Sequence, residues 1–105
     1  MKLLQVNYRR EHFDPEGEGP LAAAEKIAGV PGLQWKIWIS DQAQGAGGGI
    51  YLFDSEEHAR AFGDGILPGM LGNTPGVSDI DRRYFDVDER LTAITRGPVA
   101  ATQKA

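Results

Sequence analysis

The sequence contains no cysteine, which excludes disulfides, thiolate metal ligands and a cysteine nucleophile. It has no apolar run near the roughly 20 residues of a membrane-spanning helix, and its start, MKLLQVNYRR, has no signal-peptide core. Lys and Arg form no run, and the formal net charge is −4, which disfavours a nucleic-acid partner. We therefore expect a cytoplasmic protein that binds neither a membrane nor nucleic acid.

What the chain does contain is typical of one globular domain. Of its 105 residues, 41% are apolar and 25% are charged, which is an ordinary balance for a folded chain. The 14 glycines indicate several tight loops. We expect one domain over residues 1–97, ended by a helix that Gly97 closes, and a flexible C-terminal tail over residues 98–105.

Alternating and helical patterns predict the order β-α-β-β-α-β with an extra C-terminal helix. The predicted strands cover residues 3–8, 33–40, 48–53 and 77–87. With the two long helices as right-handed crossovers, these strands form a four-stranded antiparallel sheet that both helices cover on one side. The predicted fold class is α+β, with a ferredoxin-like architecture.

Capping signals place the helices. Pro20 suits the first turn of a helix that ends before Gly29. Asp54 or Ser55 caps the second helix, and an irregular connection over 66–76 follows it. The inner stripe of the second helix is predicted to comprise Ala59, Phe62 and Ile66. Asp86 has capping-box spacing to Glu89 and is predicted to open the last helix.

The second and third strands are apolar on both faces. In the second strand, strict alternation places one set of side chains on one face: Leu33, Trp35, Ile37 and Ile39. The opposite face then carries Gln34, Lys36 and Trp38. In the third strand, Tyr51 and Phe53 lie on one face, and Ile50 and Leu52 on the other. The set that faces away from the helices is therefore either Trp38, Ile50 and Leu52, or Trp35, Ile37, Tyr51 and Phe53. Burying one set contributes on the order of 5–8 kcal/mol, at about 1.5–3 kcal/mol for each large side chain.

No spare element of the chain is large enough to cover that second face. An exposed apolar patch of this size is unusual on a monomer, so we expect a homodimer in which two sheets pack face to face. The alternative is a monomer with one half-exposed tryptophan.

Three segments resemble a known family: PGLQWKIW (31–38), GGIYLF (48–53) and YFDV (84–87). They resemble the YdhR family, small proteins of the dimeric α+β barrel superfamily that are described as monooxygenases. The resemblance runs from about Leu3 to Arg96, and the pattern PG-x-x-WK-x-W followed by GGIYLF is specific.

The resemblance implies a dimeric α+β barrel with its helices outside and a pocket between sheet and helices in each subunit. Superfamily relatives include cofactor-free oxygenases that convert phenolic polyketides to quinones, haem-degrading enzymes, isomerases and members without an established activity. We expect a cofactor-independent monooxygenase acting on a small hydrophobic, aromatic or enolisable molecule. Two alternatives remain open: an isomerase or cyclase that transfers protons in the same pocket, and a non-catalytic dimer that binds a small ligand.

Aromatic and polar side chains supply the candidate site. The predicted substrate-binding residues are Trp35, Lys36, Trp38, Phe53, Phe62, Met70 and Tyr84. For each aromatic residue a simple place in the core is the competing interpretation. Lys36 is either a charge at the edge or dimer rim whose stem covers an indole, or a pocket cation for an enolate.

The predicted catalytic residues are His58, Arg82, Arg83 and Tyr51. His58 is a candidate because histidine is the most common general base in enzymes, although a histidine on a helix flank is often inert. Arg82 and Arg83 face opposite ways on one strand, so one can hold an anionic oxygen while the other pairs with Asp79 or Asp81.

Two further motifs are discounted. GAGGGI (45–50) opens a strand and not a helix, so it is no phosphate-binding loop. The two histidines, His12 and His58, are far apart in sequence, and we expect no metal site and no cofactor.

Overall fold

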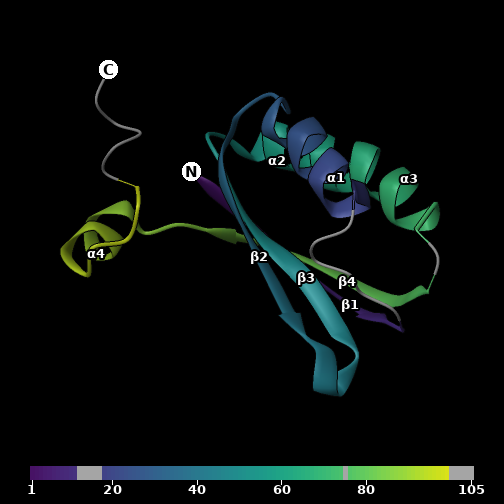
Figure 1. Ribbon diagram of the computed structural model, residues 1–105. Helices are drawn as coiled ribbons and strands as arrows, with labels where there is room; N and C mark the ends of the chain where they lie inside the picture. The colour runs from purple at the N-terminus through teal and green to yellow at the C-terminus, as the bar shows by residue number, and fades with distance from the viewer. Residues whose placement is uncertain (12–17, 75, 100–105) are drawn as a thin grey trace.

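The fold is a four-stranded antiparallel sheet covered by helices on one face (Figure 1). The structure is a computed structural model, and it describes residues 1–11, 18–74 and 76–99. His12 and residues 100–105 of the predicted tail lie outside the described residues.

The strands are β1 (Lys2–Arg10), β2 (Leu33–Asp41), β3 (Ala46–Phe53) and β4 (Val77–Asp86). They lie in the order β2-β3-β1-β4, and every neighbouring pair is antiparallel. A short turn, η1 (Gln42–Gln44), closes the β2–β3 hairpin. The arrangement confirms the ferredoxin-like α+β fold that the sequence predicts.

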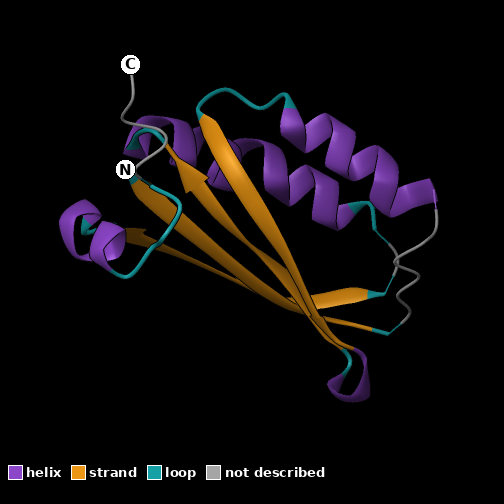
Figure 2. Cartoon of the chain, turned by 60° about the vertical axis from the view of Figure 1, so that its left-hand side comes forward, coloured by secondary structure: helices purple, strands orange, loops and turns teal. Residues whose placement is uncertain are grey.

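Helix α1 (Glu18–Ala28), helix α2 (Glu56–Arg60), the π-helical turn η2 (Ala61–Ile66) and helix α3 (Leu67–Gly72) lie on one side of the sheet (Figure 2). Helix α4 (Glu89–Ile94) lies apart from them, beyond the end of β4 (Figure 1). We call the sheet face under α1, α2 and α3 the inner face and the opposite one the outer face.

The hydrophobic core lies between the inner face and these helices. Its centre is a group of three aromatic rings, with centroids 5.1 Å apart for Tyr51 and Phe62 and 5.8 Å apart for Phe53 and Phe62. Leu4 and Leu67 complete the packing, and all five side chains are buried. The core thereby joins β1 and β3 to the helices that follow β3.

The connection after α2 is helical, so the prediction of an irregular segment is wrong for residues 66–72. Pro68 lies in the first turn of α3, where its missing N–H breaks no helical hydrogen bond. The π-helical turn before it inserts one extra residue. Ile66, the predicted inner position, is therefore 41% exposed, and Leu67 is buried in its place.

The last helix begins later than predicted. Asp88 is its cap, accepting a hydrogen bond from the Leu91 N–H at 2.9 Å. Asp86 belongs instead to β4, where it pairs with Lys2 across the ladder. Strand pairing thus includes the predicted cap residue, the cap lies two residues later at Asp88, and the capping-box spacing was misleading.

A β-bulge in β2 overturns the strict alternation of that strand. Leu33 pairs with Phe53, whereas Trp35 pairs with Leu52, so the register shifts at Gln34. An inserted residue moves the side chains that precede it in the strand to the opposite face of the sheet. Leu33 consequently packs against the core, while Trp35 points to the outer face.

The outer face mixes the two predicted sets, so neither set is correct as a whole. Residues directly opposite on paired strands share a face, and Trp35 opposes Leu52 while Ile37 opposes Ile50. Lys36 and Trp38 oppose Tyr51 and Gly49 and therefore lie on the inner face. The outer face carries seven apolar side chains: Leu3, Trp35, Ile37, Ile39, Ile50, Leu52 and Phe85.

The chain after α4 returns to one end of the outer face. Trp35 Nε1 donates a hydrogen bond to the Pro98 carbonyl at 3.0 Å, and Val99 is buried. Ile37 and Phe85 remain 50% and 46% exposed. The outer face is therefore covered only in part, and the predicted domain end at residue 97 stays a prediction.

Candidate functional site

A mainly apolar cavity lies between the inner face and helices α1 and α3. It has a volume of about 330 Å³, which is at the lower end for small-molecule sites. Three strands form its floor, and α1, α3 and the residues that follow α3 form its walls. Its lining residues are Tyr8, Arg10, Gly19, Pro20, Ala23, Ile27, Lys36, Trp38, Gly48, Tyr51, Leu67, Met70, Leu71, Asn73 and Thr74.

Lys36 provides the amine of the cavity. Its Nζ lies 3.2 Å from the centroid of the Trp38 ring and 4.5 Å from that of Tyr51. Among the described residues that line the cavity there is no Asp or Glu. Burial without a carboxylate disfavours the ammonium form and lowers the pKa of Lys36 to about 7. The geometry therefore matches the pocket-cation interpretation of Lys36 and not the rim charge.

Gly49 makes room for this lysine. A Cβ at that position would lie 2.5 Å from Lys36 Cε, which is closer than real contacts allow, and 3.1 Å from Tyr51 Cε1, which is a tight contact. The missing side chain lets Lys36 bend back over the ring of Tyr51. The glycine-rich strand thus shapes the floor of the cavity, and its glycines serve a close approach of side chains and not a phosphate.

Tyr51 forms the wall behind the lysine and is itself buried. Burial raises the pKa of its phenol, with the nearby Tyr8 as a second cause, so the hydroxyl keeps its proton at physiological pH. Phe53 and Phe62 do not line the cavity, but their rings pack on Tyr51 and hold its position. Tyr51 is thus placed as a hydrogen-bond donor inside the cavity.

Polar residues also line the mouth of the cavity, and sequence reasoning missed three of them. Arg10 comes from the last residue of β1, and Asn73 and Thr74 follow α3. The signal for Arg10 was available, because it continues the inner-face alternation of Val6 and Tyr8 along the strand. Asn73 and Thr74 gave no comparable signal, since the helix that positions them was predicted as irregular.

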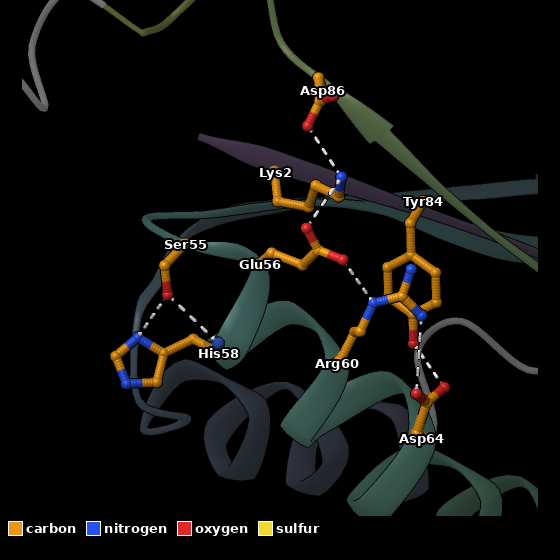
Figure 3. Close-up of polar contacts among 8 residues, drawn as sticks. All are labelled: Lys2, Ser55, Glu56, His58, Arg60, Asp64, Tyr84 and Asp86. Carbon is orange, nitrogen blue, oxygen red and sulfur yellow. Dashed lines mark hydrogen bonds and ion pairs between the residues drawn. The ribbon is translucent and has the colours of Figure 1, made fainter.

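Several predicted site residues lie away from the cavity. Trp35 lies on the outer face, where it lines a second hollow of about 300 Å³ with Leu52, Phe85 and Val99. His58 lies in α2, with its Nδ1 3.3 Å from Ser55 Oγ (Figure 3). The same Nδ1 lies 2.7 Å from Asp54 Oδ1. The hydrogen bond with His58 lowers the pKa of Asp54.

The two arginines of β4 separate as expected. Arg83 pairs with Asp81 at 2.9 Å and does not line the cavity. Arg82 lies on the inner face, where Nη1 donates to the Gly63 carbonyl and lies 3.4 Å from Asp64. Both arginines therefore have protein partners outside the cavity.

Tyr84 belongs to a group of charged and polar residues that joins β1 and β4 to α2 and η2 (Figure 3). The Tyr84 hydroxyl donates a hydrogen bond to Asp64 Oδ1 at 2.7 Å. The Arg60 guanidinium carbon lies 4.3 Å from the centroid of the Tyr84 ring. Burial and the bond to Asp64 raise the pKa of Tyr84 to about 12. We call this group the polar seam; its members are Lys2, Glu56, Arg60, Asp64, Arg82, Tyr84 and Asp86.

Neither a metal-binding cluster nor a membrane-spanning helix is found among the described residues. The described residues contain no cluster of three or more His, Cys, Asp or Glu side chains that could hold a metal ion. None of the helices described is both long and apolar enough to cross a membrane. The cytoplasmic location stays a prediction.

The fold and the cavity together define a small α+β protein with a ligand-sized site between sheet and helices. Residues 3–98 match the family described as "Putative mono-oxygenase ydhR", and the chain belongs to this family. The match confirms the family that the sequence resembles. The search among curated proteins gave no match.

Among solved structures, the chain is similar to a point mutant of MhuD, which was crystallised with two manganese protoporphyrin IX molecules bound per active site. The identity is 16%, the similarity covers 82% of this chain and 94% of that chain, and the TM-score is 0.47. A similarity at this level transfers neither a ligand nor an activity.

Proposed function

We propose that this protein is a monooxygenase that needs no cofactor and oxidises a small aromatic or enolisable molecule in the cavity between sheet and helices. The observation that carries the proposal is the position of Lys36 Nζ, which lies inside an aromatic-lined cavity that has no carboxylate among its described lining residues. Membership of the ydhR family supports the reaction class.

Lys36 acts as the general base. At neutral pH a large fraction of its amine is unprotonated, because its pKa is about 7, and such an amine accepts a proton from an acidic C–H or O–H of the substrate. The resulting ammonium then lies beside the substrate anion and stabilises it. Trp38 and Tyr51 hold a planar substrate near the amine, and the Tyr51 hydroxyl donates a hydrogen bond to its oxygen.

The overall reaction balances without an external reductant. A substrate CH₂ group and O₂ give a C=O group and one water molecule, and the electrons that reduce O₂ come from the methylene carbon. The protein therefore has to remove a proton, stabilise the anion and admit O₂. The chain supplies groups for the first two tasks in Lys36 and Tyr51.

The test is O₂ uptake with a panel of anthrones, hydroquinones and enolisable ketones. We expect uptake matched to product, and a loss of kcat/KM of at least about 100-fold in Lys36→Met, the usual scale for removing a general base. Lys26→Met is the matched control, because Lys26 is an exposed lysine of α1 that does not line the cavity. The kcat/KM of the native protein should rise with pH and level off above about 7.

Other outcomes separate the alternatives. Product formation without O₂ consumption would identify an isomerase or cyclase that uses the same base. Thermal stabilisation by members of the panel without turnover would identify a small-ligand-binding protein. Full activity of Lys36→Met would refute the role of the lysine.

A homodimer that packs outer face on outer face is part of this proposal. The support is the partly covered apolar surface that includes Ile37 and Phe85. We expect sedimentation at micromolar concentration to give the mass of two chains, and Ile37→Lys to give a folded monomer. Leu21→Lys, a change at a 63% exposed position of α1, should leave the dimer intact; a native monomer would refute the assembly.

A further inference from the structure

Lys36 is placed as a nucleophile as well as a base. Its Nζ lies over the rings of Trp38 and Tyr51 and faces a cavity large enough for a ring-sized ligand. A lysine amine attacks carbonyl carbons when it is desolvated and not held by a carboxylate. Burial supplies the first condition, and a described lining without Asp or Glu supplies the second.

The neighbouring glycine makes this placement specific. A side chain at Gly49 would meet Lys36 Cε at 2.5 Å and Nζ at 3.3 Å. The space left by Gly49 therefore holds the end of the Lys36 side chain, and the rings of Trp38 and Tyr51 flank its amine.

We infer that Lys36 captures aromatic aldehydes or ketones as a covalent imine in this cavity. The ligand class follows from the lining. The two rings beside Nζ favour a flat aromatic body, the aliphatic side chains of Ile27, Leu67 and Met70 enclose it, and the amine selects an electrophilic carbonyl.

The step balances without any further reactant. The neutral amine attacks the carbonyl carbon, a C–N bond forms, and one proton moves from nitrogen to the carbonyl oxygen to give a carbinolamine. Loss of that oxygen as water breaks the C–O bond and leaves a C=N bond, so amine and carbonyl give imine and H₂O. Tyr51, which stays protonated, is the lining hydroxyl that donates to the departing oxygen, and Tyr8 is the second phenol of the cavity.

The inference uses the cavity and the amine of the proposed function but does not rest on its oxygen chemistry. Capture needs no O₂, so it can be tested under nitrogen.

The experiment is reductive trapping. The full-length protein is incubated anaerobically at pH 7 with benzaldehyde and sodium cyanoborohydride, and the adduct is located by peptide mass mapping. We expect one benzyl group on Lys36, formed at least about tenfold faster than on any other lysine, because the Lys36 amine is buried over two rings and no carboxylate is among the described residues that line its cavity. The Met1 amino group, which pairs with Glu89 at 3.1 Å, is the internal competitor.

Two variants complete the test. Lys36→Arg should abolish the fast adduct while the slow surface labelling remains. Gly49→Ala should slow labelling of Lys36 by displacing its stem, with circular dichroism as the check on folding. If a variant fails to fold, the map of the native protein still locates the adduct.

The outcomes are distinct. Labelling spread evenly over surface lysines, or confined to Met1, would overturn the inference. O₂ uptake on the substrate panel without a Lys36 adduct would overturn it while leaving the proposed function in place. A Lys36 adduct in a protein that takes up no O₂ with any substrate would support it and refute the oxygenase.

Discussion

Two lysines on the inner face of the same sheet have opposite environments. Lys2, at the start of β1, lies 2.8 Å from Asp86 and 3.5 Å from Glu56, and the hydrogen bond with Asp86 raises its pKa. Lys36, in β2, lies over two aromatic rings, and burial lowers its pKa to about 7.

The difference shows that partners, and not strand position, decide what a lysine does. At the polar seam, carboxylates from α2 and β4 hold Lys2 as a cation that links strand to helix (Figure 3). At the cavity, the helices bring only apolar and neutral polar groups to the described lining beside Lys36, apart from Arg10 of β1. One end of the inner face therefore carries ion pairs that join strand to helix, and the other carries a buried amine in a cavity.

The largest predicted effect is in the titration of the two amines. Lysine Cε resonances followed by NMR should give a pKa of about 7 for Lys36 and a value above 10.5 for Lys2. At pH 8 the neutral fractions of these amines then differ by more than about 100-fold. Lys36→Met assigns the Lys36 resonance. If both lysines titrated near 10.5, the contrast on which the proposed function rests would be lost.

The next effect is at the point where η2 meets β4. A Cβ on Gly63 would lie 2.1 Å from the Tyr84 hydroxyl, so we expect Gly63→Ala to lower the free energy of unfolding by about 1–3 kcal/mol, as overpacking does. Gly65→Ala is the matched control in the same turn, because nothing lies within 4 Å of its added Cβ. Urea unfolding measures both, and an equal effect of the two would show that Gly63 is not a close contact.

The seam and the cavity should also respond separately to that change. Gly63→Ala acts on Tyr84 and Leu4, so it should leave the pKa of Lys36 unchanged. A shift of the Lys36 titration in this variant would show that the two ends of the inner face are coupled.

A smaller effect is expected in the pH dependence of stability. The folded-state pKa of Lys36, about 7, lies below its ordinary value of 10.5, so between these values the unfolded chain binds the proton and the folded chain does not. Stability therefore rises with pH above about 7, by at most about 1.4 kcal/mol per pH unit. Lys36→Met should flatten urea midpoints between pH 7 and 9 and should be more stable than the native protein at pH 6; a steeper slope in the variant would contradict the sign.

The smallest effect is expected for Lys2→Met. Asp86 is 91% exposed at its side chain, and ion pairs with exposed partners contribute little. Because the pKa of Lys2 is raised, its contribution is present below pH 10.5 and is lost as pH rises through the folded-state value. We expect a small decrease in Tm at low salt that disappears at high salt, and a large decrease independent of salt would show that the stem of Lys2 matters more than its charge.

Much of the fold follows from local patterns in the sequence. The order of strands and helices, the cap at Ser55 and the hairpin after β2 come from alternation, capping residues and glycines that act over a few residues. The bulge at Gln34 could not be predicted, because it depends on how β2 pairs with β3 and not on β2 alone. The same is true of the π-helical turn, which moves Leu67 into the place of Ile66.

The sequence predicted which kinds of residue form the candidate site, but not which of the predicted residues lie together in it. Lys36, Trp38, Tyr51 and Met70 line the cavity as expected of substrate-binding or catalytic residues, although their roles stay predictions. Trp35 shares a motif with Lys36 yet lies on the opposite face, since neighbouring strand residues point opposite ways. His58 and Tyr84 have partners at the other end of the helices.

The sequence by itself determined the ferredoxin-like order, the two-sided apolar sheet and the family, because each depends on residue types at short spacing. Only the tertiary structure decided which lysine is an ion-pair partner and which is a buried amine. The physical reason is that a pKa depends on desolvation and on charges brought from distant segments, and residues 49, 51 and 86 reach these two lysines only after the strands have paired.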